Sequence, residues 1–120
     1  MADEITVQAS IQVVNGNLRD SFVIGSQSID QSALGGPTPG YVTIGTSEEE
    51  VAFGELSAKG YVMMQNLDTT NYVQWGFSTG VYGGRMKAGE TAGPFRMDAT
   101  SMFLRANTAA CKVLIKGYNA

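Results

Sequence analysis

Cys111 is the only cysteine and the first residue to consider as a nucleophile, but the chain contains no histidine to activate it. Without histidine, the commonest general base and the commonest metal ligand are both missing. No Ser-His or Cys-His nucleophile pair can form. Because Cys111 also opens an apolar stretch, we interpret it as a buried structural thiol. We therefore predict that the protein is not an enzyme and has no catalytic residue.

Two clusters of oxygen-bearing side chains are candidates for cation binding. Asn66, Asp68 and Asn71 could ligate a hard cation such as Ca²⁺, but the further carboxylates of a calcium loop are missing. Asp and Asn at this spacing more often bond the backbone of a turn. The glutamate run at 48–50 could attract a cation or a basic partner, although a solvated loop is the simpler interpretation. We predict no metal site and no cofactor.

Glycine and basic residues between positions 80 and 96 could contact phosphate. Gly80, Gly83 and Gly84 precede Arg85, but the lysine-serine ending and the helix of a phosphate loop are absent. These glycines more often permit bulges or bends in a curved sheet. A weak basic patch is conceivable from Arg85, Lys87 and Arg96. The net charge of -3 and the pI near 4.7 argue against a nucleic-acid partner.

Three aromatic residues could stack on a sugar or a base: Tyr72, Trp75 and Tyr82. Such residues are more often part of a core or of a protein interface than of a ligand platform. A carbohydrate- or receptor-binding function therefore remains an alternative rather than the first hypothesis.

The composition predicts one domain over residues 1–120, with residues 1–40 as a possible arm or long loop contributing to assembly. The chain is 43% hydrophobic and only 16% charged, and it holds 15 glycines, which suits an all-β fold with many turns. Asp3 and Glu4 are acidic where a signal peptide would be basic, so we expect none. No apolar run approaches transmembrane length, so we expect no membrane partner.

Period-two alternation and turn residues predict eight to ten short strands and almost no helix. Residues 4–14 alternate, Asn15-Gly16-Asn17 predicts a tight turn, and residues 19–30 return. A second hairpin is expected over residues 60–77, at the middle of the core. Residues 31–40 are expected to form the longest loop, and a helical turn fits residues 51–56. We predict an antiparallel sandwich or barrel whose core contains Ile11, Val13, Val62, Met64, Val73, Val113 and Ile115.

The stretch from Lys59 to the C-terminus resembles small virion proteins of tailed bacteriophages. The similarity rests on the strand-turn pattern through Asn66-Leu67-Asp68, on the return through Tyr72-Val73-Gln74-Trp75-Gly76, and on Lys87-Ala88-Gly89-Glu90. Phe95-Arg96-Met97 and a closing strand from Cys111 follow. The resemblance covers about half of the chain. It implies a jelly-roll-like antiparallel β-sandwich on the outside of a capsid, or at the neck or tail.

The resemblance implies a capsid decoration protein that stabilises a phage head, assembled in the host cytoplasm and located in the virion. Its expected partners are the major capsid protein or other virion proteins, and further copies of itself as a dimer or trimer. The alternatives are a neck or tail accessory protein and the glycan-binding module; a cupin-like enzyme is the weakest. Loops and termini adapt most easily to a partner. The candidate assembly contacts are therefore Ala2, Asp3, Glu4, Gly35, Gly36, Pro37, Thr38, Pro39 and Gly40.

Overall fold

The computed structural model describes residues 4–31, 33–54, 56 and 59–119, and these residues form ten strands and no helix. None of the described residues belongs to a helix that could cross a membrane. The strands are β1 (Ile5–Asn15), β2 (Leu18–Ile29), β3 (Thr38–Ile44), β4 (Glu49–Glu50), β5 (Lys59–Asn66), β6 (Val73–Gly76), β7 (Gly84–Met86), β8 (Thr91–Arg96), β9 (Phe103–Ala106) and β10 (Cys111–Asn119). The predicted all-β fold and the expected number of strands are confirmed.

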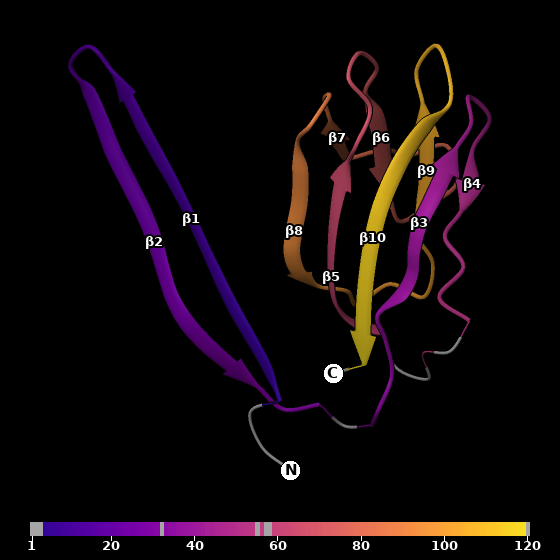
Figure 1. Ribbon diagram of the computed structural model, residues 1–120, viewed down its shortest axis with the longest axis horizontal. Helices are drawn as coiled ribbons and strands as arrows, with labels where there is room; N and C mark the ends of the chain where they lie inside the picture. Colours follow the sequence, from indigo (N-terminus) through magenta and orange to yellow (C-terminus); the bar gives the residue numbers. More distant parts are fainter. Residues whose placement is uncertain (1–3, 32, 55, 57–58, 120) are drawn as a thin grey trace. The chain divides into compact units, whose positions relative to one another are not determined.

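The chain divides into two compact units, residues 1–32 and residues 33–120. The first is a long two-stranded antiparallel hairpin of β1 and β2, and the second contains the other eight strands (Figure 1). The sequence-based limit of the possible arm, residue 40, therefore lies eight residues beyond this division. Residues 33–40 belong to the second unit, because β3 already begins at Thr38.

The second unit is a β-sandwich with the strand order of a jelly roll. One sheet has the order β3-β10-β5-β8 and the other has the order β4-β9-β6-β7 (Figure 1). Every connection except the one from β6 to β7 passes from one sheet to the other. Eight strands wound between two four-stranded antiparallel sheets in this way make a jelly roll. The predicted jelly-roll-like sandwich is confirmed.

The core of the sandwich lies between the two sheets and is filled by alternate residues of the strands. Along β10, Cys111, Val113 and Ile115 are buried while Lys112 and Lys116 are exposed, which is the period of two expected of a half-buried strand. Five predicted core residues are almost completely buried: Val62, Met64, Val73, Val113 and Ile115. Other buried residues of the same core include Met86, Met102 and Leu104.

The hairpin predicted over residues 60–77 is wrong, although its two strands exist. β5 pairs with β8 and β10, whereas β6 pairs with β7 and β9, so the two strands belong to opposite sheets. The polar segment between them crosses from sheet to sheet. The side-chain amide of Asn66 directs this crossing, because it donates to the carbonyl oxygens of Asn71 at 2.9 Å and Met86 at 3.1 Å.

Two loop predictions also need correction. The described residues of 51–56 form no helix, and the helical turn expected there is limited to one hydrogen-bonded turn. Val51, Phe53 and Leu56 instead bury their side chains in the core, and a single turn joins the Leu56 amide to the Phe53 carbonyl at 2.9 Å. Apolar residues at irregular spacing fit this extended segment as well as they fit a helix. The expected loop over residues 31–40 is shorter than predicted, since its last three residues pair with β10 as part of β3.

Candidate contact surface

The β1-β2 hairpin carries nearly all of its apolar residues on one face. Directly opposed residues of an antiparallel pair share a face. The register pairs Ala9 with Ile24 and Ile11 with Phe22. The same face also carries Ile5 with Ile29, Val7 with Gln27, Val13 with Asp20, and Asn15 with Leu18. We call these twelve residues the apolar face of the hairpin, although Gln27, Asp20 and Asn15 are polar exceptions.

The opposite face of the hairpin is polar. It carries Thr6, Gln8, Ser10, Gln12, Arg19, Ser21, Ser26 and Ser28, with Val14 and Val23 as its apolar exceptions. The side-chain amide of Gln8 donates to the Ser26 hydroxyl at 2.7 Å across the two strands. The hairpin is therefore amphipathic, as a ribbon with one face in contact with a partner would be.

A β-bulge keeps the apolar residues of β2 on one face. Between Val7 and Ala9 on β1, the partner strand advances by three residues, from Gln27 to Ile24. This extra residue falls at Gly25 and Ser26, and a bulge there reverses which residues point to which side. Without it, Ile24 and Ile29 would lie on opposite faces, because they are separated by an odd number of residues.

The apolar face is exposed along most of its length. Val7, near the base, is buried, whereas Ile11 is 66% exposed, Phe22 64% and Leu18 59%. Contiguous exposed apolar surface on a soluble protein marks a site of interaction with another surface. The prediction that Ile11 and Val13 belong to the core is wrong: they lie on the hairpin, and Val13 is 37% exposed. Their alternation is that of a buried strand, but no second layer of the hairpin covers them.

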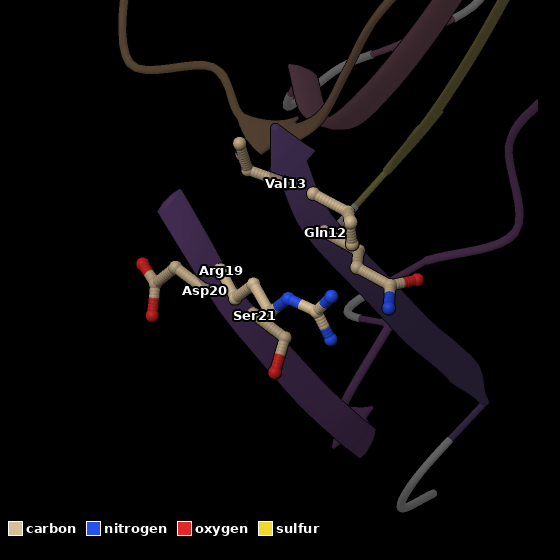
Figure 2. Close-up of a pocket in the computed structure, with 6 residues that line it drawn as sticks. Gln12, Val13, Arg19, Asp20 and Ser21 are labelled. Carbon is tan, nitrogen blue, oxygen red and sulfur yellow. The ribbon is translucent and has the colours of Figure 1, made fainter. Parts of the chain in front are cut away.

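The tip of the hairpin separates two opposite charges. An open hollow of about 390 Å³ is lined by Gln12, Val13, Val14, Arg19, Asp20 and Ser21. Figure 2 shows the Arg19 guanidinium and the Asp20 carboxylate directed away from one another. Arg19 thus belongs to the polar face, and Asp20 is the only charged residue on the apolar face. A lone charge on such a face restricts what can pack against it.

The predicted contact residues at the N-terminus are only partly described. Ala2 and Asp3 lie outside the described residues. Glu4 is exposed, and its carboxylate accepts a hydrogen bond from the backbone amide of Gln31 at 2.9 Å. This bond joins the two ends of the hairpin at its base. An assembly role for these residues stays a prediction.

The predicted contact residues at 35–40 are built into the sandwich rather than free. The Gly35 carbonyl oxygen accepts a hydrogen bond from the backbone amide of Asn119 at 3.3 Å. A Cβ at Gly36 would overlap the Gly117 carbonyl oxygen. Thr38 is buried, and β3 pairs Thr38, Pro39 and Gly40 with β10. Pro37 is exposed. Pro39 is tolerated because β3 is the edge strand of its sheet. A contact role for this segment also remains a prediction, but its sequence is constrained by packing.

The three aromatic residues considered as a ligand platform each have a partner inside the sandwich. Trp75 stacks on Phe95 with ring centroids 5.4 Å apart, and Gly84 lies against its indole. The Arg85 guanidinium lies 4.1 Å from the Tyr72 ring centroid. Tyr82 lies under Arg105 at 4.7 Å and donates its hydroxyl hydrogen to Glu48. Arg85, Lys87 and Arg96, the candidate basic patch, lie on β7, after it, and on β8.

The side chains of the Asn66–Asp68–Asn71 cluster stabilise a turn by hydrogen bonds to its backbone. The Asp68 carboxylate accepts hydrogen bonds from the amides of Asn71 at 2.6 Å and Thr70 at 2.9 Å. These bonds lower the pKa of Asp68 below its ordinary value. Asn66 is fully buried, and its side-chain oxygen accepts from the Asp68 amide at 3.0 Å. The interpretation of this cluster as turn chemistry is confirmed.

Glu48, from the glutamate run, also has partners. The Tyr82 hydroxyl and the Gly80 amide both donate to its carboxylate, and these bonds lower the pKa of Glu48. Glu49 and Glu50 form the short strand β4 and are exposed. Cys111 is completely buried, and burial raises the pKa of its thiol. The interpretation of Cys111 as a buried thiol is confirmed.

The sequence pattern indicates the apolar face of the hairpin, but it does not distinguish an exposed face from a core face. Alternation in residues 4–14 and a matching return strand identify an amphipathic ribbon. They do not reveal which layer, if any, covers it. Comparison with protein-family models, curated proteins and solved structures gives no match, so the function must be inferred from the residues of this chain.

Proposed function

We propose that this chain is a structural protein that acts by contact, and that it attaches to a larger assembly through the apolar face of its hairpin. The observation that carries the proposal is the exposure of Ile11, Phe22 and Leu18 on one face of a two-stranded ribbon. Following the resemblance of its C-terminal half, we propose that the assembly is the virion of a tailed bacteriophage. There the chain would act as a decoration protein on the major capsid protein.

The physical argument concerns the stability of the ribbon. A two-stranded hairpin is marginally stable in water and gains independent stability when a further layer covers an apolar face. Burying a side chain such as Ile11 or Phe22 contributes about 1.5–3 kcal/mol relative to leaving it exposed. A partner that covers this face therefore stabilises the hairpin and gains affinity from the same contacts.

A repetitive shell suits such a surface. Each hairpin offers a small contact, and small contacts become effective when many equivalent sites are engaged together. The jelly roll supplies a rigid body whose eight strands are joined by turns with their own hydrogen bonds, such as the Glu90 amide to the Lys87 carbonyl at 2.9 Å. A neck or tail position would use the same surface.

Glycan binding is the alternative of a different class. It requires aromatic faces free to stack on a sugar ring. Tyr72 and Tyr82 are each within 5 Å of an arginine guanidinium, and Trp75 is stacked on Phe95, so a glycan would have to displace these partners. The contact proposal needs no such rearrangement.

The proposal is tested with particles from the native source from which this protein has been removed. We expect the purified chain to bind them again, and the double variant Ile11→Ser/Phe22→Ser to lose at least about tenfold in affinity because two buried anchors are removed. The matched control is Val23→Ser, since Val23 is 69% exposed but lies on the polar face. Equal binding of the double variant and the parent would overturn the proposal, as would failure of the parent to bind.

A further inference from the structure

We infer that the apolar face of the hairpin is covered by the same face of a second copy of the chain, packed face to face with the strands antiparallel. This inference rests on the proposed contact function and names what covers the face while the chain is free of the larger assembly. The dimer must dissociate before the same face binds that assembly. The two-fold axis would pass beside the Ser10–Val23 pair, which lies midway between the ends of the face. Each strand would then cross over its own counterpart, as the strands of two aligned sheets do.

The arrangement matches residue types along β2. Rotation about this axis places Ile24 over the partner's Phe22, and Ile29 over the partner's Leu18. It also places Gln27 over the partner's Asp20. The side-chain amide of Gln27 is a hydrogen-bond donor for that carboxylate, so the only charge on the apolar face meets a polar group.

The residues of β1 match in the same way. Ala9, the smallest residue of the face, lies over the partner's Ile11, whereas Val7 is already buried in the single chain and adds no contact. Small against large is the pattern by which facing layers interdigitate. Only the pair of Ile5 with the partner's Asn15 joins an apolar to a polar residue, and it lies at the end of the ribbon.

The parallel arrangement does not match. A two-fold axis along the strands would place β1 over the partner's β2, with the same register on both sides. Asp20 would then face the exposed Val13. A carboxylate packed against an apolar side chain loses its hydration without gaining a partner, which is costly. The distribution of polar residues therefore favours the antiparallel dimer.

The size of the face indicates a reversible association. A strand of 11 residues is about 36 Å long, and two strands with their side chains are about 10 Å wide. Two copies would bury on the order of 700 Å², which is below the range of stable, specific interfaces. We therefore expect monomers when the protein is dilute and dimers at about 100 µM chain and above.

The first test alters the charge pairing and follows the dimer by sedimentation equilibrium of the full chain from about 1 to about 300 µM. Gln27→Glu would place a second carboxylate against the partner's Asp20 and should weaken the dimer at least about tenfold. Adding Asp20→Lys to the same chain should restore it to within about threefold of the parent, because the two charges then attract. Ser21→Glu, a new carboxylate on the polar face, is the matched control and should leave the dimer unchanged.

The second test measures the direction of the strands. Spin labels at Asn17, near the tip, on a Cys111→Ala background should lie about 40 Å apart in the antiparallel dimer, which corresponds to about 12 residues of strand. Parallel packing would bring the labels within about 20 Å. A short distance, a parent that stays monomeric at about 300 µM, or no rescue by Asp20→Lys would each overturn the inference.

Failure of the inference is distinguishable from failure of the proposed function. A chain that stays monomeric but loses particle binding in the Ile11→Ser/Phe22→Ser variant overturns the dimer and leaves the contact function in place. A dimer with the predicted register that does not bind native particles supports the inference and overturns attachment to the virion.

Discussion

At the residue scale, the segment that joins the two sheets depends on a few side chains that replace missing backbone bonds. Asn66 is buried without a charge and has a partner for each of its side-chain polar atoms. Asp68 is half-buried, and its carboxylate accepts hydrogen bonds from two backbone amides. Its negative charge strengthens these bonds, which is why its pKa is lowered.

The lowered pKa of Asp68 predicts a dependence of stability on acid. A carboxyl group whose pKa is lower in the folded than in the unfolded state stabilises the fold above its unfolded pKa, and that contribution is lost as the pH falls through the folded pKa. In chemical unfolding from pH 7 to about pH 2, Asp68→Asn should lose less stability than the parent, because it has no carboxyl group to protonate. Parallel curves for the two proteins would contradict this account.

Because the Cys111 thiol is buried, it should react slowly with thiol reagents. Its Sγ lies 3.5 Å from the Ala109 carbonyl oxygen, and burial keeps the pKa of the thiol above its ordinary value. A disulfide reagent at pH 8 should label the folded chain at least about 100-fold more slowly than the chain in denaturant, since reaction requires opening of the sandwich. Equal rates in the two conditions would show that the thiol is accessible.

At the scale of elements, strand positions could be predicted but strand partners could not. The sequences of β5 and β6 have the apolar residues of strands, and Asn66, Asp68 and Asn71 have the chemistry of a turn. That chemistry fits a hairpin and a crossing between sheets equally well. The choice is made by the hydrogen bond from Asn66 to Met86, which is 20 residues away, and local pattern contains no information on it.

Replacing an isoleucine with alanine should cost more free energy of unfolding in the sandwich than in the hairpin. Ile115→Ala removes a fully buried side chain from the sandwich core and should lower the free energy of unfolding by about 2–4 kcal/mol. Ile11→Ala, at a dilution where the chain is monomeric, should cost less than about 1 kcal/mol, since Ile11 is 66% exposed. Denaturant titrations of the sandwich compare the two, and a cost for Ile11→Ala equal to that of Ile115→Ala would contradict the assignment of Ile11 to the hairpin.

A single methyl group added at Gly36, in the segment that leads into β3, should lower the stability of the sandwich. Gly36 has a φ of 97°, and a Cβ there would overlap the backbone carbonyl of Gly117. Gly36→Ala should therefore destabilise the sandwich by about 1–3 kcal/mol, through strain and displacement of β10. Gly54→Ala is the matched control, because a Cβ at Gly54 meets nothing within 4 Å. Equal melting temperatures of the two variants would show that residues 35–40 are a free loop after all.

At the scale of the whole molecule, the two units of the chain differ in how much of their apolar surface is buried. The sandwich buries its apolar residues between its own sheets, so Val113 and Ile115 could be predicted as core from the alternation of their strand. The hairpin has the same alternation, but it consists of one two-stranded sheet and contains no second layer to cover its apolar face. Sequence pattern identifies an apolar face, but what lies against the face depends on a partner that the pattern does not contain.

Hydrogen exchange of the full chain tests most directly whether the apolar face of the hairpin is a contact surface. It should be measured on the dilute chain at about 2 µM, on the concentrated chain at about 200 µM, and on the chain bound to native particles. We expect the amides of β1 and β2 to exchange rapidly in the dilute chain and to become protected in at least one of the other two states, while those of β5 and β10 stay protected throughout. Exchange of the hairpin at one rate in all three states would contradict the account.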